Sequence, residues 1–107
     1  MKQKYIVIYT TLPNLSSAKK LVGGMVKARI AACGNIFKIS SIYRWQGKIE
    51  KSPEYGVFIK TRRTKYRVVE NYIKENHPYR VPEIISWEIN QGLNSYLKWI
   101  DTETRRH

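Results

Sequence analysis

Two side chains with soft ligand atoms, Cys33 and His77, are the first candidates for chemistry in this sequence. A thiolate and an imidazole together suit copper or zinc. The chain offers few other soft ligands, because its remaining sulfur and imidazole groups are two methionines and His107. One thiol and one imidazole do not complete a tetrahedral site, so Glu83 or a second subunit would have to supply further ligands.

Both candidate ligands also have a structural explanation. A lone cysteine is often a small buried apolar side chain, and a histidine at a helix C-terminus interacts favourably with the helix dipole. Closed structural metal sites normally carry more ligands than these two residues provide. Because Cys33 and His77 each follow a predicted helix, we expect both at one end of the fold.

A lysine-carboxylate pair is the second candidate feature. Lys60 lies in a predicted strand near Phe58 and could face a cavity, where it would pair with Glu83. A buried lysine-carboxylate pair of this kind is either structural or holds an anion. A lysine that simply points into solvent from the strand is the simpler explanation for Lys60. For Trp45 and Tyr79, the simpler explanation is a role in packing. No Ser-His-Asp set, glycine-rich phosphate loop, paired-histidine metalloprotease motif or CxxC is evident. The sequence therefore gives no argument for an enzyme.

The stretch HPYRVPEI, residues 77–84, gathers several candidates between a predicted helix and a predicted strand. Proline fixes its own φ and disfavours helical geometry in the preceding residue. The two prolines therefore predict a rigid helix-to-strand crossover. The same rigidity would hold His77, Tyr79 and Glu83 at fixed positions, which makes this corner a candidate binding site.

Hydrophobic periodicity predicts the elements that position these residues. The expected strands cover residues 4–12, 36–46, 55–62 and 83–90. The expected helices cover 16–31, 64–77 and a last segment that begins at Asn94 or Ser95. This order, β-α-β-β-α-β plus a terminal helix, predicts an α+β, ferredoxin-like sandwich in one domain over residues 1–107. Two helices would cover one face of a four-stranded antiparallel sheet.

Local signals predict where the first helix begins and ends. Asn14 and Ser16 are the candidates for its N-cap. Residues 33–35, Cys-Gly-Asn, tolerate positive φ and are expected to terminate it. Further along, Gln46-Gly47 suits a two-residue hairpin turn.

Helical spacing predicts the side chains that face the core. In the first helix these are Ala18, Leu21, Val22, Met25 and Arg29. In the second helix, with Thr64 as its expected cap, they are Tyr66, Val69, Tyr72 and Ile73. The pair Gly23-Gly24 costs the first helix roughly 1 kcal/mol per glycine relative to alanine, which close packing against the sheet would explain.

The hairpin over residues 36–62 is long for such a sandwich. An arm of ten or more residues spans on the order of 35 Å, whereas a domain of this size has a radius of gyration near ~13 Å. Its tip carries Tyr43, Trp45 and Ile49, and an exposed ribbon with such a face needs a partner. We therefore predict a closed homo-oligomer. The alternative is a monomer whose hairpin is bulged at Pro53.

The net charge of +12, from 20 Lys and Arg against 8 Asp and Glu, is the unusual bulk property. Such a surface attracts nucleic acid, and RNA-recognition modules have the same element order and stack bases on strand aromatics. Tyr5, Tyr9 and either Tyr55 or Phe58 would be those aromatics. Against this alternative, the third strand lacks the glycine-aromatic pattern, and the basic residues are dispersed.

The composition also bears on the compartment. The apolar run in MKQKYIVIYTTLPN is too short to cross a membrane and is not followed by a cleavage site of small residues. A single cysteine cannot form an internal disulfide, which fits a reducing cytoplasm. We expect a cytoplasmic protein without a membrane partner.

Four stretches in this order, RIAACGNI (29–36), SIYRWQGKIE (41–50), HPYRVPEI (77–84) and YLKWI (96–100), resemble the CutA family of divalent-cation tolerance proteins. The resemblance runs from the YTT of the first strand to the last helix. It implies a trimer of ferredoxin-like subunits whose long hairpins pair around a three-fold axis. It also implies a cytoplasmic role in tolerance of copper and other divalent metals, through binding rather than catalysis.

The resemblance also assigns roles to residues. Cys33 and His77 correspond to positions tied to metal. Lys60, Trp45, Tyr79 and Glu83 correspond to positions that line a pocket between subunits. No cofactor is implied beyond copper or another divalent cation, and the implied partners are two further copies of the chain.

Overall fold

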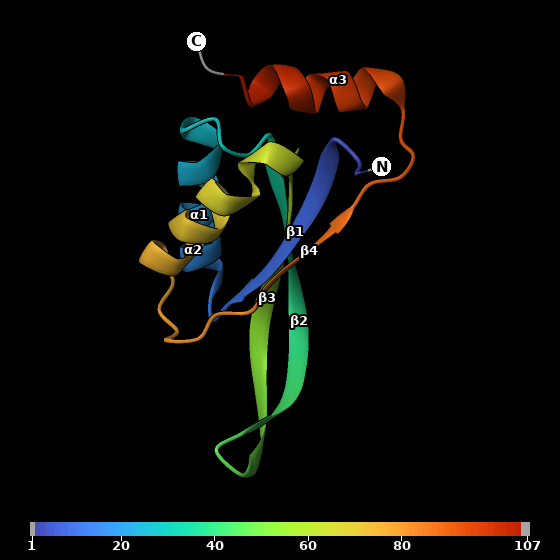
Figure 1. The fold of residues 1–107 in the computed structure, drawn as a ribbon. Coiled ribbons are helices and arrows are strands. Elements are labelled where there is room, and N and C mark those ends of the chain that lie inside the picture. Colours follow the sequence, from blue (N-terminus) through green and yellow to red (C-terminus); the bar gives the residue numbers. More distant parts are fainter. Residues whose placement is uncertain (1, 106–107) are drawn as a thin grey trace.

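Four antiparallel strands form one sheet, and two helices cover one of its faces (Figure 1). The computed structural model describes residues 2–105. Its strands are β1 (Tyr5–Leu12), β2 (Cys33–Trp45), β3 (Lys48–Arg62) and β4 (Ile84–Glu88). Its helices are α1 (Leu15–Lys27), α2 (Tyr66–Asn76) and α3 (Asn94–Glu103), and a short 3-10 helix, η1 (Arg63–Lys65), leads into α2. The spatial order β2-β3-β1-β4 confirms the predicted ferredoxin-like α+β fold.

Alternation along the two central strands builds the core. Ile6, Ile8 and Leu12 of β1 are at most 3 % exposed, because every second side chain points towards the helices. From β3, Val57 and Ile59 are fully buried. The helices contribute the expected residues, among them Ala18, Leu21, Met25, Val69 and Ile73. Since α1 and α2 lie on the same side of the sheet, its other face stays open.

The first helix ends earlier than the sequence predicted. As expected, Asn14 caps it, and its side-chain oxygen accepts a 2.8 Å hydrogen bond from the N–H of Ser17. The helix stops at Lys27, and Arg29 takes a left-handed backbone conformation with φ 61°. Residues 33–35 do not terminate the helix; they begin β2 instead. Helix termination by a non-glycine residue gives no clear signal in the sequence.

The glycine pair in α1 serves packing between helices rather than packing on the sheet. A Cβ on Gly24 would collide with the Tyr72 hydroxyl of α2 and lie 3.0 Å from its Cζ atom. A Cβ on Gly23 would meet no atom within 4 Å. Only one of the two glycines is therefore required by a neighbouring element.

Alanine at these two positions is expected to have opposite effects. Gly23→Ala should stabilise the fold by about 0.5–1 kcal/mol, because it removes backbone freedom from the unfolded chain without a clash. Gly24→Ala should destabilise it by about 1–3 kcal/mol, because Tyr72 has to move. Urea unfolding of the two variants provides the measurement. Equal shifts of the same sign would contradict this account of the pair.

The β2-β3 hairpin extends past the rest of the sheet, as its length predicted (Figure 1). β1 pairs with β3 only as far as Leu12, opposite Tyr55. Within the described residues, the part of β3 that precedes Tyr55 pairs with β2 alone. The predicted two-residue turn is confirmed at Gln46 (φ 51°) and Gly47 (φ 80°). The described chain is correspondingly elongated, with extents of 44 × 27 × 22 Å.

Pro53 does not bulge the hairpin, as the alternative interpretation required. β3 runs without a break, and Pro53 pairs with Ser40 in an unshifted register. The reason is the overhang itself. At this point no strand of residues 2–105 pairs with the second side of β3, and an edge position tolerates the missing N–H of proline. The locally bulged hairpin is thus excluded, although the overhang remains.

The expected side-chain caps of the later helices are also wrong. Thr64 lies within η1, and no side chain in the described part of the chain caps α2. Leu93 is the N-cap residue of α3, and neither Asn94 nor Ser95 caps it. The end of α2 is as predicted, because His77 is extended before Pro78.

The last helix crosses the end of the sheet opposite the hairpin tip (Figure 1). Asp101 holds it there through Lys4 at 3.2 Å and Arg62 at 3.7 Å, and it also pairs with Arg105 at 2.8 Å, four residues further along the chain. The hydrogen bonds from Arg105 and Lys4 lower the pKa of the Asp101 carboxyl. Ile100 anchors the helix through complete burial.

Candidate functional site

A cleft of about 530 Å³ lies between the hairpin and the loop that joins α2 to β4. The hairpin contributes Tyr43, Trp45 and Glu54, and the end of β1 contributes Thr11. The loop contributes the rest of the lining, Pro78, Tyr79, Arg80, Val81 and Glu83. The predicted rigid corner therefore forms one wall of a cavity, and the overhanging hairpin forms the other.

A buried carboxylate is the central feature of this cleft. Glu54 is only 5 % exposed, and the Tyr79 hydroxyl donates a 3.1 Å hydrogen bond to it. Burial of a charge is costly without a partner of opposite charge. Within residues 2–105, no lysine or arginine forms an ion pair with Glu54 or Glu83. Arg80 also lines the cleft, but it forms no ion pair with either carboxylate in the described residues.

Burial and the nearby carboxylates act together on two tyrosines of this region. Burial, and then the charges of Glu83 and Glu54, raise the pKa of Tyr9. Burial, and then the hydrogen bond to Glu54, raise the pKa of Tyr79 to about 12. Glu54 and Glu83 line the same cleft. Such a pair of oxygen ligands suits a divalent cation.

His77 organises the loop through both ring nitrogens. Nε2 donates to the Thr11 carbonyl oxygen at 2.6 Å, and Nδ1 accepts from the Tyr79 N–H at 3.0 Å. The imidazole therefore carries its proton on Nε2 in this arrangement. A metal ion at His77 would have to replace one of these two bonds.

Cys33 and His77 do not lie at one end of the fold, contrary to the prediction. Cys33 lies opposite Lys60 of β3 in the sheet. His77 is hydrogen-bonded to Thr11, which lies opposite Gly56 of the same strand. Four residues along a strand correspond to about 13 Å. The reason is topological: α1 and α2 run in opposite directions along the sheet, so the segments that follow them emerge at opposite ends.

Cys33 has its own polar neighbour near α3. Its Sγ atom lies 3.6 Å from the Tyr96 hydroxyl. Burial, and then the hydrogen bond to Cys33, raise the pKa of Tyr96 to about 12. No group of three or more His, Cys, Asp or Glu side chains within residues 2–105 is placed to hold a metal ion. In one subunit, the predicted ligands therefore stay divided between two places.

Lys60 does not pair with Glu83, which corrects a second expectation. Its ammonium donates to the Asn35 side-chain oxygen on the adjacent strand. Glu83 precedes β4 and lies near the far end of β1, because Ile84 pairs with Thr10. Of the residues assigned by resemblance to a pocket between subunits, Trp45, Tyr79 and Glu83 line the cleft, and Lys60 does not.

Glu54 is the functional candidate that the sequence reasoning missed. The available signal was strand alternation, since Glu54 shares a face of β3 with Phe58 and Lys60, both of which were singled out. Its burial could not be inferred, because it depends on Tyr79 from a loop 25 residues away.

An aromatic cluster occupies the open face of the sheet. Phe58 is its centre, with ring centroids 4.9 Å from Phe37, 5.5 Å from Tyr9 and 6.0 Å from Trp87. Trp87 and Ile85 of β4 remain 45 % and 50 % exposed. A contiguous apolar face of this kind on a folded protein marks a contact surface.

Replacement of Tyr79 by phenylalanine is expected to change the stability at alkaline pH. The pKa of the Tyr79 phenol is about 12 in the folded state, against an ordinary value of 10. The neutral phenol therefore stabilises the fold fully below pH 10, and this contribution is lost as the pH rises towards 12. The variant should therefore lose less stability than the natural chain between pH 10 and 12. Unfolding at several pH values measures this difference.

The Glu54→Gln variant tests the cause of the raised Tyr79 pKa directly. It keeps an acceptor for the Tyr79 hydroxyl but removes the negative charge, so the phenol should ionise nearer pH 10. Absorbance of tyrosinate follows the change directly. A Tyr79 titration unmoved by Glu54→Gln would contradict the assigned hydrogen bond.

Comparison with known proteins supplies the family. The model of the CutA1 divalent ion tolerance protein family matches residues 6–103. The divalent-cation tolerance protein CutA of Pyrococcus horikoshii is 41 % identical over 101 residues, 94 % of this chain and 99 % of that protein. The chloroplastic protein CutA of Arabidopsis thaliana is 40 % identical over 94 % of this chain, which spans 56 % of the plant protein's length.

Solved structures agree with these sequence matches. CutA1 of Shewanella sp. SIB1 superimposes with a TM-score of 0.95 at 34 % identity, covering 99 % of this chain and 100 % of that one. The protein described as the periplasmic divalent cation tolerance protein CutA of Archaeoglobus fulgidus gives 0.93 at 37 % identity, covering 94 % and 99 %. Because the family model, the sequence matches and the superpositions each cover nearly all of it, the chain belongs to the CutA1 divalent ion tolerance protein family.

Proposed function

We propose that this protein acts as a homotrimer that binds divalent cations, copper among them, and that it is a binding protein rather than an enzyme. The observation that carries the proposal is the pair of carboxylates, Glu54 and Glu83, in one cleft with no ion-pair partner within residues 2–105. The names of the relatives as cation tolerance proteins support it.

Self-association is supported by two surfaces that a single subunit leaves uncovered. One is the hairpin tip, where Ile42, Trp45 and Ile49 are 69 %, 49 % and 56 % exposed. The other is the aromatic cluster on the open sheet face. Burial of both surfaces would provide the main driving force for assembly. The number three comes from the resemblance to the family, whose hairpins pair around a three-fold axis.

The proposed ligands come from more than one subunit. Glu83 and Glu54 would provide oxygen atoms, and His77 would provide a nitrogen after release of one of its two hydrogen bonds. Cys33 would add a thiolate from another subunit, which favours copper or zinc over calcium or magnesium. A site divided in this way agrees with the separation of Cys33 from His77 within one chain.

Calorimetric titration of the assembled protein with Cu²⁺ and Zn²⁺ tests the proposal. Glu83→Gln and His77→Ala are each expected to weaken binding about tenfold or more, since each removes a ligand. Cys33→Ser should weaken Cu²⁺ and Zn²⁺ binding but leave Mn²⁺ binding intact. Glu75→Gln, at an exposed position of α2, is the control.

Unchanged Cu²⁺ affinity in both Glu83→Gln and His77→Ala would overturn the assignment of this cleft. Oligomeric state should be recorded for each variant, so that loss of assembly is distinguished from loss of a ligand. A natural chain that sediments at 12.7 kDa would overturn the trimer.

Binding of RNA is the alternative function. The observation that favours it is the aromatic cluster itself, since Tyr9 and Phe58 lie on an open sheet face in a chain of net charge +12. Tyr55 packs against the core and is not available for stacking. Self-association and RNA binding would compete for the same face. Binding of single-stranded RNA that persists at 0.15–0.2 M salt would favour RNA, because generic electrostatic binding weakens steeply with salt.

The cytoplasm is the proposed compartment. The single cysteine supports it. None of the helices within residues 2–105 is both long and apolar enough to cross a membrane. Relatives are described as periplasmic in Archaeoglobus fulgidus and chloroplastic in Arabidopsis thaliana. Cell fractionation with an antibody against the natural chain tests the assignment.

A further inference from the structure

The carboxylate cleft is larger and more apolar than a site for a metal ion alone requires. Its volume of about 530 Å³ lies in the range of sites for small organic molecules. Five of its nine lining residues are aromatic or aliphatic, namely Tyr43, Trp45, Pro78, Tyr79 and Val81. A bare ion makes no use of such a lining, whereas the hydrocarbon part of an organic ligand would be buried against it.

A buried carboxylate gives the cleft its charge. Glu54 is 5 % exposed, and the Tyr79 hydroxyl donates to it at 3.1 Å. The lining contains two carboxylates, of Glu54 and Glu83, against one guanidinium, of Arg80, and its net charge is therefore minus one. Arg80 is exposed and forms no ion pair with either carboxylate within residues 2–105. A ligand with one positive charge would supply the counter-charge that the buried carboxylate needs.

The register of the hairpin places an aromatic wall beside this carboxylate. Tyr43 lies opposite Glu50, so it shares a face of the hairpin with Ser52 and Glu54, which follow Glu50 at alternate positions of β3. The Tyr43 hydroxyl lies 3.5 Å from the Ser52 hydroxyl, which shows that the ring leans along the hairpin towards Glu54. Trp45 is the next side chain of β2 on the same face. The two rings and the carboxylate therefore line one continuous cleft.

This combination of groups selects an organic ammonium ion. No group of three or more His, Cys, Asp or Glu side chains within residues 2–105 is placed to hold a metal ion, so one subunit cannot chelate a metal here. An ammonium group needs fewer ligands, because it donates hydrogen bonds to a carboxylate and is attracted by aromatic faces. A neutral or anionic molecule would leave the charge of Glu54 uncompensated.

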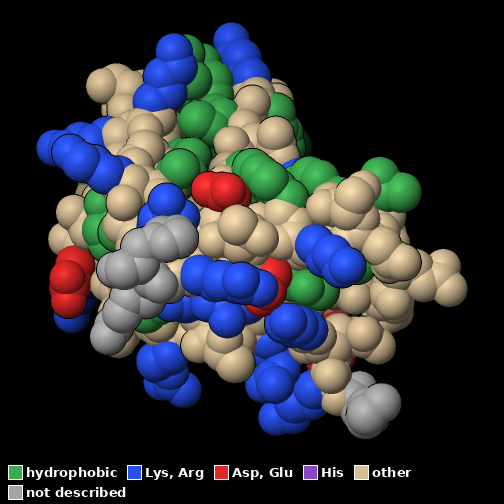
Figure 2. All heavy atoms as spheres, turned by 90° about the horizontal axis from the view of Figure 1, so that it is seen from above, with side chains coloured by type: hydrophobic (Ala, Val, Ile, Leu, Met, Phe, Trp, Pro, Cys, Tyr) green, Lys and Arg blue, Asp and Glu red, His purple; other side chains and the backbone are tan. Residues whose placement is uncertain are grey.

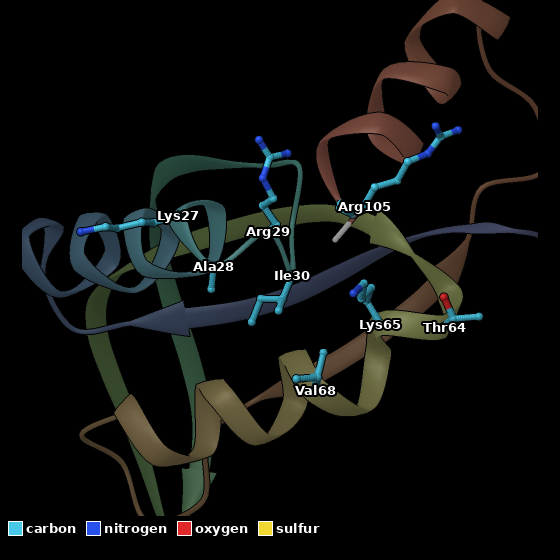
Figure 3. Close-up of a pocket in the computed structure, with 9 residues that line it drawn as sticks. Lys27, Ala28, Arg29, Ile30, Thr64, Lys65, Val68 and Arg105 are labelled. Atoms are coloured by element: carbon cyan, nitrogen blue, oxygen red, sulfur yellow. The ribbon is translucent and has the colours of Figure 1, made fainter. Parts of the chain in front are cut away.

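The cavity at the opposite end of the fold has no such arrangement. It measures about 570 Å³ and opens where the end of α1, the start of α2 and the end of α3 meet (Figure 3). Figure 2, which looks onto the end that carries α3, shows Lys and Arg side chains gathered there. In Figure 3, however, Lys27 and Arg29 point away from Lys65 and from the cavity. Because these cations do not converge, they do not define a ligand.

We propose that the carboxylate cleft binds a small organic amine in its ammonium form. The ammonium group lies at Glu54 and Glu83, and an aromatic or branched apolar group lies against Tyr43 and Trp45. This goes beyond the proposed metal function, because the amine needs neither Cys33 nor His77, and neither of these residues lines the cleft.

Calorimetric titration of the assembled protein with 2-phenylethylamine tests this proposal, at 0.15 M salt and with EDTA present to remove metals. The dissociation constant should lie below about 1 mM. The neutral analogue 2-phenylethanol keeps the ring and should bind about tenfold more weakly or worse, because Glu54 stays without a counter-charge. Ethylamine keeps the charge and should also lose about tenfold or more, because it lacks the ring.

The matched pair of variants is Glu54→Gln and Glu50→Gln. Both remove one negative charge from the same face of β3, but Glu50 does not line the cleft. Glu54→Gln should weaken binding of the amine about tenfold or more, and Glu50→Gln should bind as the natural chain does. Tyr43→Ala should weaken amine binding but not Cu²⁺ binding, and Cys33→Ser should do the reverse. Sedimentation of each variant shows whether assembly is retained.

Equal losses in Glu54→Gln and Glu50→Gln would overturn the proposal in favour of diffuse electrostatic attraction. So would 2-phenylethanol that binds as tightly as the amine, or an absence of binding at about 1 mM 2-phenylethylamine. A protein that binds the amine but not Cu²⁺ would support this proposal and overturn the metal function alone.

Discussion

Replacement of Phe58 by glutamate is expected to convert the proposed trimer into 12.7 kDa monomers. Phe58 is the centre of the aromatic cluster on the open sheet face, in contact with rings from the other three strands. If that face is buried between subunits, the new carboxylate would lose its hydration without gaining a partner, which costs several kcal/mol per ion. Three equivalent subunits would each incur the cost, so assembly should fail. Sedimentation equilibrium at micromolar concentration measures the outcome.

Val26→Glu is the matched control for this experiment. Val26 is 40 % exposed and Phe58 is 36 % exposed, but Val26 lies on α1, away from the open face. The control should remain assembled. Circular dichroism separates dissociation from unfolding in both variants. If the Phe58 variant keeps the natural mass while folded, the open face is not the subunit interface.

Truncation of Ile8 to alanine is expected to cost about 2–5 kcal/mol of folding free energy. Ile8 is fully buried in the middle of β1, opposite Ile59 of β3 and Ser86 of β4, and it faces both helices of the covered side. Removal of three carbon atoms leaves a cavity that two strands and two helices cannot close. Since natural domains have only about 5–15 kcal/mol of net stability, the loss is a large part of the total.

Urea unfolding at one fixed protein concentration measures this effect. The midpoint should fall with an unchanged slope, because the surface exposed on unfolding hardly changes. Val26→Ala, at a half-exposed position of α1, should change stability by no more than about 0.5 kcal/mol. A loss below 1 kcal/mol for Ile8→Ala would mean that the core is centred elsewhere.

The amino-acid sequence by itself determined the order of the elements and several of their ends. A continuous run of apolar, β-branched and aromatic residues predicted β1, and helical spacing predicted the buried faces of α1 and α2. Gln46-Gly47 and Pro78 fixed a turn and a helix end. These features could be predicted because each depends on φ preferences or on burial of one face, which are properties of neighbouring residues. The family motifs likewise lie within short stretches of the chain.

Tertiary structure alone decided which of the chemical residues meet. The opposite directions of α1 and α2 separated Cys33 from His77, and the packing of the α2-β4 loop on the hairpin buried Glu54 beneath Tyr79. The convergence of three helix ends formed the cationic cavity around Arg29. None of these contacts is local, and each depends on how elements distant in the sequence pack together. For that reason the sequence could name candidate ligands, but only the fold could group them into sites.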